Sequence, residues 1–310
     1  MYNEELKREF IKNCCEDKAS VNRAIRLFNM AEKFENSWEK DICTVSEEDL
    51  GEALQEITSA RLGTQTADMH VLKKYARWCI DNNVPGACEG LLKNQDIGYD
   101  KLRATMVGDP AQLKNYLDKV FLPISDCRAD NLCRGFFWLA FMGLAEDDAA
   151  EIKVEHVDLK NLSICYNGNT YPIYNEAVPA IRYLCSANSF FYDFNRYEVV
   201  IERNVGTNIL RGTRSSCGVN TDSIGRLAST RVSAATKISD EKIILRYKSI
   251  RTSGIFYRMS EVEKQTGSVD TKKYLRMYFP DTDRLVDKRI RRKELEFETD
   301  YRRWKTAFNK

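Results

Sequence analysis

The sequence has few of the residues that build metal centres or cross-linked folds. Only two histidines occur in 310 residues, and the ten cysteines are scattered without a CxxC pair. A Cys/His zinc site needs closely spaced ligand pairs, and disulfide frameworks are typical of short exported chains. We therefore expect neither a metal site nor disulfides, and we expect most cysteines to be small buried apolar residues.

Long apolar runs and cofactor motifs are absent as well. No segment approaches the roughly 20 consecutive apolar residues that span a bilayer, and the N-terminal residues lack the apolar core of a secretory signal. There is no GxGxxG, no Walker lysine motif and no HExxH. The sequence predicts a cytoplasmic protein with no membrane contact and no cofactor.

Charge is present in quantity, and it is unevenly distributed. The formal net charge of the chain is +2, yet residues 201–310 carry 25 Lys and Arg against 14 Asp and Glu, a net +11. Residues 1–200 carry a net −9. A basic third of this kind is typical of a polyanion partner, most often nucleic acid. A solvated surface helix is the alternative explanation for the most basic part, 284–305.

Helical periodicity covers the first hundred residues. Apolar positions recur at helical spacing over 4–17, 20–39, 46–60 and 65–82, and Ser20 and Ser46 are candidate N-terminal caps. The segment that follows, 83–108, is rich in turn-forming residues. These patterns predict a helical domain over 1–105 and a second domain over 106–310.

The second domain mixes helices with a small sheet. Helices are predicted at 110–121 and 129–144, and again at 176–187, 221–239, 245–263 and beyond 270. A strand is predicted at 154–159, and two β-prone runs flank Asn167-Gly168, a strong hairpin signal. The fold class is therefore mainly α with a small antiparallel β-sheet.

Three segments, in this order, resemble the tyrosine recombinase (phage integrase) family. FMGLAEDDAAEIKVEHVDL at 141–159 is similar to its first motif, the hairpin 162–174 lies where the family has its sheet, and KSIRTSGIF at 248–256 is similar to its second motif. The resemblance implies a helical core-binding (SAM-like) domain and an integrase catalytic-like domain that close around duplex DNA. It covers roughly residues 45 to 280.

The departures from the family pattern concern catalysis. The first catalytic arginine of the family falls on Ala145, the histidine of the second motif on Lys248, and the nucleophilic tyrosine near Asp283. Only Arg251 keeps its expected identity. Loss of a single preorganised donor typically costs about 10²–10³ in rate. The resemblance therefore implies no strand cleavage, and instead a sequence-specific transcriptional repressor in a bacterial host cell that maintains phage lysogeny by binding operator repeats.

Cationic side chains are the candidate DNA contacts. Arg251 is expected to contact a phosphate, as the resemblance implies, with Lys248 on the same helix face. Arginine suits bidentate guanine recognition, and a row at positions i, i+3, i+4 and i+7 that begins at His70 suits a phosphate backbone. The full set of expected contacts to double-stranded DNA is Lys73, Lys74, Arg77, Arg211, Arg214, Arg226, Arg231, Lys248 and Arg251. Each is also explicable as an ordinary surface cation.

Two alternative functions remain open. The first is an active tyrosine recombinase with a displaced nucleophile, for which the candidates are Tyr274, Tyr278 and Tyr301; Arg302 and Arg303 beside Tyr301 are expected to lower its pKa. The second is a helical protein that binds other proteins.

The basic segment 288–305 likewise has two interpretations. It lies on DNA, or it packs on a second copy of the chain. Self-association of this kind would use Leu295, Phe297, Trp304 and Phe308.

Overall fold

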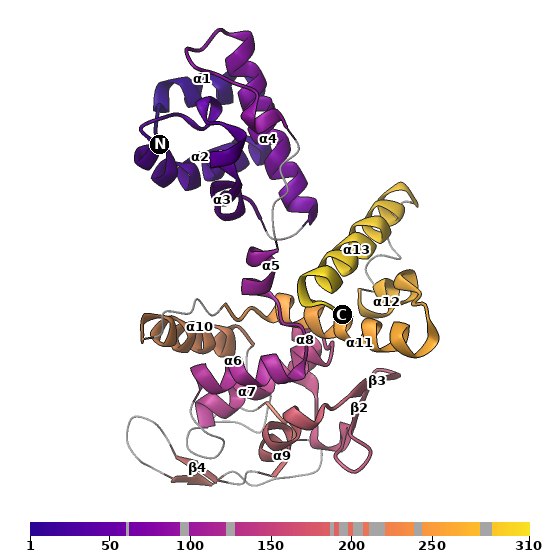
Figure 1. The fold of residues 1–310 in the computed structure, drawn as a ribbon. Coiled ribbons are helices and arrows are strands. Elements are labelled where there is room, and N and C mark those ends of the chain that lie inside the picture. The colour runs from indigo at the N-terminus through magenta and orange to yellow at the C-terminus, as the bar shows by residue number, and fades with distance from the viewer. Residues whose placement is uncertain are drawn as a thin grey trace. The chain divides into compact units, whose positions relative to one another are not determined.

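The chain divides into two compact units, Met1–Leu102 and Arg103–Lys310. The computed structural model describes residues 1–59, 62–93, 99–121, 128–186, 189–191, 198–200, 207–210, 221–238, 244–279 and 287–310. In the described part, the first unit is helical and the second combines helices with short strands (Figure 1). The prediction of a mainly helical chain with a small antiparallel sheet is confirmed.

Four α-helices form the first unit, as predicted. They are α1 (Glu4–Cys14), α2 (Lys18–Trp38), α3 (Glu47–Ile57) and α4 (Leu62–Asp81), with the short 3-10 helices η1 (Ile42–Thr44) and η2 (Gly90–Leu92). The start of α2 differs from the prediction. The cap is Asp17, whose Oδ1 accepts the backbone N–H of Ser20 at 2.7 Å, so Ser20 is the third residue of a capping box and not the cap.

The core of the first unit combines aromatic packing with a buried ion pair. The rings of Phe10, Phe28 and Tyr75 meet edge to face, with centroids 4.8 to 5.9 Å apart. Beside them the Lys7 Nζ donates to both carboxylate oxygens of Glu35 at 2.5 Å, and all of these side chains are fully buried. A charge can be buried only when it is paired in this way.

The second unit contains most of the remaining helices. α5 (Asp100–Thr105) spans the division between the units. The others are α6 (Pro110–Val120), α7 (Arg128–Phe141), α8 (Glu146–Glu151), α9 (Val178–Ser186), α10 (Thr221–Ile238), α11 (Tyr247–Thr266), α12 (Thr271–Tyr278) and α13 (Asp287–Phe308), with the 3-10 helices η3 (Val154–His156) and η4 (Asn175–Ala177). The Asp109 side chain caps α6 by accepting the Gln112 N–H, and Pro110 occupies the first turn of this helix, which was expected at 110–121.

Helices α7 and α11 form the centre of this unit. The second half of α7 is apolar and buried, with Phe136, Leu139 and Phe141 on different sides of the helix. At the crossing with α11 stands Gly254, where a Cβ would lie 1.7 Å from the carbonyl oxygen of Phe141. The crossing therefore requires glycine at this position.

The sheet has the order β1-β2-β3, formed antiparallel by Val157–Asp158, Ser163–Tyr166 and Asn169–Pro172. Tyr166 pairs with Asn169, and the two residues between them, Asn167 and Gly168, have φ of 48° and 73°. This is the two-residue turn with two positive φ angles that an Asn-Gly pair predicts.

The strand predicted at 154–159 is mostly wrong. Residues 154–156 form η3, because the His156 Nδ1 accepts the Lys153 N–H at 3.1 Å and turns the chain there. Only Val157–Asp158 of that segment is a strand. A second sheet pairs β4 (Ser189–Phe191) with β5 (Glu198–Val200).

The last helix, α13, packs on its own chain. Phe297, Tyr301 and Trp304 are buried, and the indole Nε1–H of Trp304 donates to the Val107 carbonyl at 3.0 Å. Phe308 lies against Gly108, where a Cβ would come within 2.7 Å of the ring. Three of the four residues expected to mediate self-association therefore pack within the second unit, and only Leu295 is exposed.

Two composition-based expectations can be compared with the described residues. No helix among them is long and apolar enough to cross a membrane. Of the eight cysteines in the described part of the chain, three are buried, four are half-buried and one is exposed. The expectation that most cysteines are buried is therefore wrong for the described set.

Candidate nucleic-acid interface

Arg251 lies at the junction of three segments of the second unit. Its Nε–H donates to the Gly143 carbonyl at 2.8 Å and its Nη2 to the Tyr278 carbonyl at 2.5 Å. The guanidinium carbon lies 4.9 Å from the centre of the Phe279 ring, a cation–π distance. Arg251 thus joins α11 to the end of α7 and to the end of α12.

The backbone at Gly143, whose carbonyl accepts from Arg251, has a conformation that favours glycine. Gly143 has φ of +102°, and a Cβ there would lie 2.4 Å from the Tyr278 ring. Of the five N–H groups of the guanidinium, acceptors among the described residues engage two. The remaining N–H groups of the half-buried side chain can donate to an anion.

The groups facing Arg251 are tyrosines and one carboxylate. Burial lowers the pKa of Arg251, and the electrostatic influence of Tyr247, Tyr171 and Asp148 opposes that shift. A guanidinium stays charged in either case. Asp148 belongs to α8, which begins directly after Ala145, the position where the family resemblance implies an arginine. At the position where the resemblance implies an arginine, the chain therefore has Ala145, with the carboxylate of Asp148 nearby.

The tyrosines nearest this centre are held protonated. Burial raises the pKa of Tyr278, whose hydroxyl accepts from the Arg258 Nη1 at 2.6 Å. Burial also raises the pKa of Tyr247 well above its usual value, and its hydroxyl donates to the Leu144 carbonyl at 3.1 Å. A hydroxyl with a raised pKa is a weak nucleophile.

The expectation that arginines lower the pKa of Tyr301 is wrong. The Tyr301 hydroxyl donates to the Glu263 Oε2 at 2.6 Å, and burial together with this carboxylate raises its pKa. Arg302 turns away to form an ion pair with Glu298 at 2.6 Å. The third candidate, Tyr274, is half-buried and stacks on Tyr278 with ring centres 6.1 Å apart.

Lys248 is exposed one turn before Arg251 on α11. In α10, Arg226 is exposed, whereas Arg231 is half-buried and donates through Nε to the buried Asp130 at 3.0 Å. Arg231 therefore has a structural ion pair that the sequence did not predict. Arg211 and Arg214 lie outside the described residues.

The predicted cationic row on α4 lies on one helix face. His70, Lys74 and Arg77 are exposed and Lys73 is half-buried, while Leu72 and Ala76 on the opposite side are buried. Lys74 also donates to the Cys14 carbonyl at 2.6 Å, at the C-terminal end of α1, where a cation is favourable. The row belongs to the first unit, and the Arg251 centre belongs to the second.

Sequence reasoning missed several neighbours of Arg251. Arg258, Phe279 and Tyr171 surround the centre, and Phe279 and Tyr171 are brought there by the packing of other elements against α11. Arg258 had a signal, since it lies seven residues after Arg251, two helical turns along the same face. No sequence pattern indicated that Phe279 and Tyr171 lie near Arg251.

Comparison with known proteins gives one family match and several structural similarities. Residues 1–81 match the family model described as MrpR, N-terminal core-binding domain. This match includes α1 to α4 entirely, so the first unit is similar to that domain over these helices. A comparison with curated protein sequences finds no match.

The structural similarities are to recombinases and integrases. One is the Tn1549 transposon integrase in complex with a circular intermediate DNA: 14% identity, TM-score 0.37, covering 87% of this chain and 89% of that chain. Another is XerA recombinase, with 12% identity and a TM-score of 0.38; the similarity covers 89% of this chain and 88% of that chain. A third is the integrase from mycobacterium phage Brujita, with 14% identity and a TM-score of 0.33; the similarity covers 97% of this chain and 91% of that chain.

Proposed function

We propose that this chain is a sequence-specific DNA-binding repressor that maintains phage lysogeny by binding operator repeats, without cutting or joining strands. The observation that carries the proposal is the exposure of basic side chains on helices of both units: the row of His70, Lys74 and Arg77 on α4, and the single residues Arg226 on α10 and Lys248 on α11. Exposed cations neutralise phosphates, and phosphate contacts supply much of the affinity for duplex DNA.

Helix α10 is the element we assign to base recognition. Arg226, Thr230, Ser233 and Lys237 are all exposed and follow one helix face. From Arg226 to Lys237 the face spans about 16 Å, at about 1.5 Å per residue. Small hydroxyl side chains between two cations let a helix lie deep in the major groove, where the cations reach guanine or phosphate.

The chemistry around Arg251 supports binding without cleavage. Phosphoryl transfer by tyrosine needs an activated hydroxyl and preorganised cations around the phosphate. In this chain Ala145 stands where the family resemblance implies an arginine, and Tyr278 and Tyr301 have raised pKa values. Arg251 with Lys248 suffices for a phosphate contact, which needs only cationic donors.

The biological role in the proposal rests on resemblance. From the order of the motifs at 141–159, 162–174 and 248–256 we infer a resemblance to the integrase-like master lytic repressor of SPβ-type Bacillus phages. Residues 1–81 match the MrpR N-terminal core-binding domain, which is compatible with DNA binding. We accordingly propose that it works on DNA in the cytoplasm of a bacterial host, associated with the nucleoid. Leu295, exposed on α13, is the remaining candidate residue for contact with a second copy.

The proposal is tested by capture of DNA fragments. Purified protein is mixed with fragmented phage and host DNA at about 0.15 M salt, near physiological ionic strength. Bound fragments are sequenced, and part of each sample is denatured in SDS. We expect discrete enriched sites and no covalent adduct.

Two other outcomes contradict the proposal in different ways. An adduct that survives SDS would establish a recombinase, and Tyr→Phe variants at 274, 278 and 301 would then identify the nucleophile. Absence of any enriched site would favour a protein that binds other proteins. Arg77→Ala should weaken capture, whereas the matched control Arg8→Ala, an exposed α1 arginine paired with Glu4, should not.

A further inference from the structure

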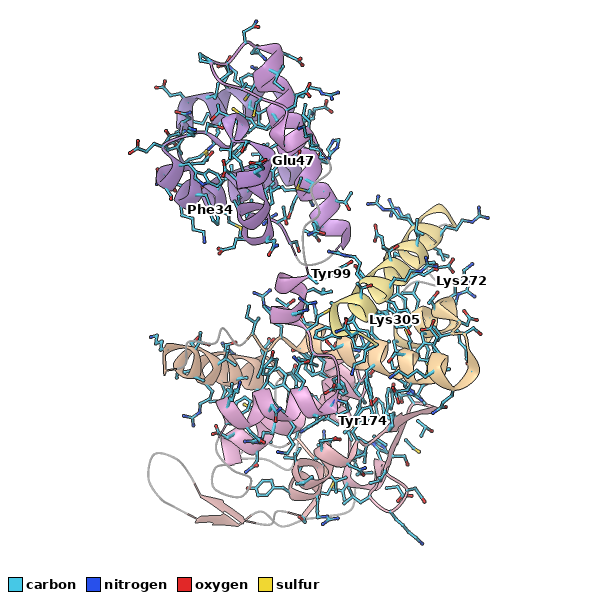
Figure 2. The ribbon with its side chains drawn as sticks, viewed as in Figure 1. Phe34, Glu47, Tyr99, Tyr174, Lys272 and Lys305 are labelled. Carbon is cyan, nitrogen blue, oxygen red and sulfur yellow. The ribbon has the colours of Figure 1, made fainter. Side chains whose placement is uncertain are left out.

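A second cationic surface lies outside the set of expected DNA contacts, and part of it belongs to the segment 288–305, for which the sequence leaves two interpretations open. It is formed by α12 and the first two turns of α13, and we call it the α12–α13 surface. Its members are the seven exposed side chains Lys272, Lys273, Arg276, Arg289, Arg291, Arg292 and Lys293. Figure 2 shows Lys272 on this part of the second unit.

The two helices hold these cations in one fixed surface. The Glu294 side chain, only 11% exposed, accepts ion pairs from Lys272 at 3.6 Å and from Arg276 at 3.4 Å, so it joins α13 to α12. The ring of Phe279, directly after α12, packs against the ring of Phe297 in α13, with centres 6.0 Å apart. α12 and α13 lie side by side (Figure 1).

The cations in the first two turns of α13 do not stabilise that helix. The N-terminal end of a helix carries a partial positive charge, so cations there are unfavourable. Arg289 and Lys293 stand at positions i and i+4, and like charges at this spacing destabilise a helix. Among the described partners, only Arg292 has a carboxylate of its own in α13, Glu296 at 2.9 Å. The surface is therefore arranged for an external anion.

The composition of the surface fits a phosphate backbone better than a protein partner. A protein–protein interface usually has an apolar core with a polar rim. Leu295, 66% exposed, is the one large exposed apolar side chain among the described residues of the second unit. Four of the seven cations are arginines, whose planar groups match phosphate geometry.

The surface begins close to Arg251. Tyr278, whose carbonyl accepts from Arg251, ends the helix that carries Lys272. Tyr278 lies six positions after Lys272, which is about 9 Å along the helix axis. We propose that the α12–α13 surface binds the backbone of duplex DNA that flanks the segment contacted at Arg251. This inference rests on the proposed function, and it adds a contact that raises affinity without sequence preference.

The test compares two triple variants with equal charge change. The first is Arg289→Gln, Arg291→Gln and Lys293→Gln, which removes three cations from the α12–α13 surface. The control is Lys160→Gln, Arg182→Gln and Lys264→Gln, three exposed cations on other parts of the second unit. Binding to a 40-base-pair duplex of mixed sequence is measured from 50 to 200 mM salt, and thermal melting checks that both variants are folded.

The expected difference is in the salt dependence. Three lost phosphate contacts reduce the slope of log K against log salt by about 2.7, so the loss of affinity over this salt range is about 40-fold smaller than for the wild type. The control should keep the wild-type slope. If the wild type binds the duplex and both variants keep its slope, the α12–α13 surface is not a DNA contact. If the wild type binds no duplex, the proposed function fails together with this inference.

Discussion

Arg251 combines a structural contact with a proposed DNA contact. Its donors to the carbonyls of Gly143 and Tyr278 join the ends of two helices, and its remaining N–H groups have no acceptor among the described residues. A substitution at this position therefore changes stability as well as affinity. Effects on DNA binding are better read from its neighbour Lys248, which is exposed.

We predict that Arg251→Ala lowers the free energy of unfolding by about 2–3 kcal/mol, because two carbonyls lose a charged donor. Arg251→Lys should recover part of this loss, since the lysine ammonium can donate to one of the two carbonyls. Lys248→Ala should change stability by less than about 0.5 kcal/mol, as is usual for an exposed side chain. Urea denaturation measures all three, and equal stabilities for Arg251→Ala and the wild type would contradict the structural contact.

At the scale of single residues, the sequence identifies candidates but not their partners. The segment KSIRTSGIF was enough to single out Arg251, yet its two acceptors are 108 and 27 residues away. The error for Tyr301 has the same origin. Its neighbours in sequence are arginines, but its neighbour in space is Glu263, 38 residues away.

At the scale of elements, local signals predict most helix ends. Asp109 with Pro110 marks the start of α6, and Asn167 with Gly168 marks the hairpin. Segment 154–156 shows the limit of such signals, because alternation suggests a strand while two hydrogen bonds between Lys153 and His156 make a turn. The close crossing of α7 and α11 could not be predicted either, since it depends on which helices meet.

Gly254→Ala should test that crossing. The new methyl group would overlap the Phe141 carbonyl and force α7 and α11 apart, and overpacking of this kind typically costs about 1–3 kcal/mol or more. Gly225→Ala in α10 is the matched control, because nothing lies within 4 Å of its Cβ position. The control should gain about 0.5–1 kcal/mol from better helix propensity. Thermal melting separates the two, and a stabilised Gly254→Ala protein would refute the requirement for glycine.

At the scale of the whole molecule, each unit carries a core of its own. Phe10, Phe28 and Leu54 belong to a cluster made entirely of residues from the first unit. A compact unit with its own hydrophobic core can fold alone.

We therefore predict that the fragment 1–102 folds and melts cooperatively. Circular dichroism should give a helical spectrum and a single transition in urea. In the same fragment, Phe10→Ala should lose about 3–5 kcal/mol, as expected for a large buried ring. A fragment without a cooperative transition would show that the first unit depends on the rest of the chain.

The Trp304 contact with Val107 has a consequence for the order of events during synthesis. It joins the first and the last segments of the second unit, 197 residues apart in sequence. Domains generally fold as units while the ribosome releases the chain from its N-terminus. The first unit can therefore fold early, whereas the second has to wait until α13 has emerged, and a ribosome that stalls before Trp304 leaves the Val107 carbonyl and the Phe256 ring without their partner.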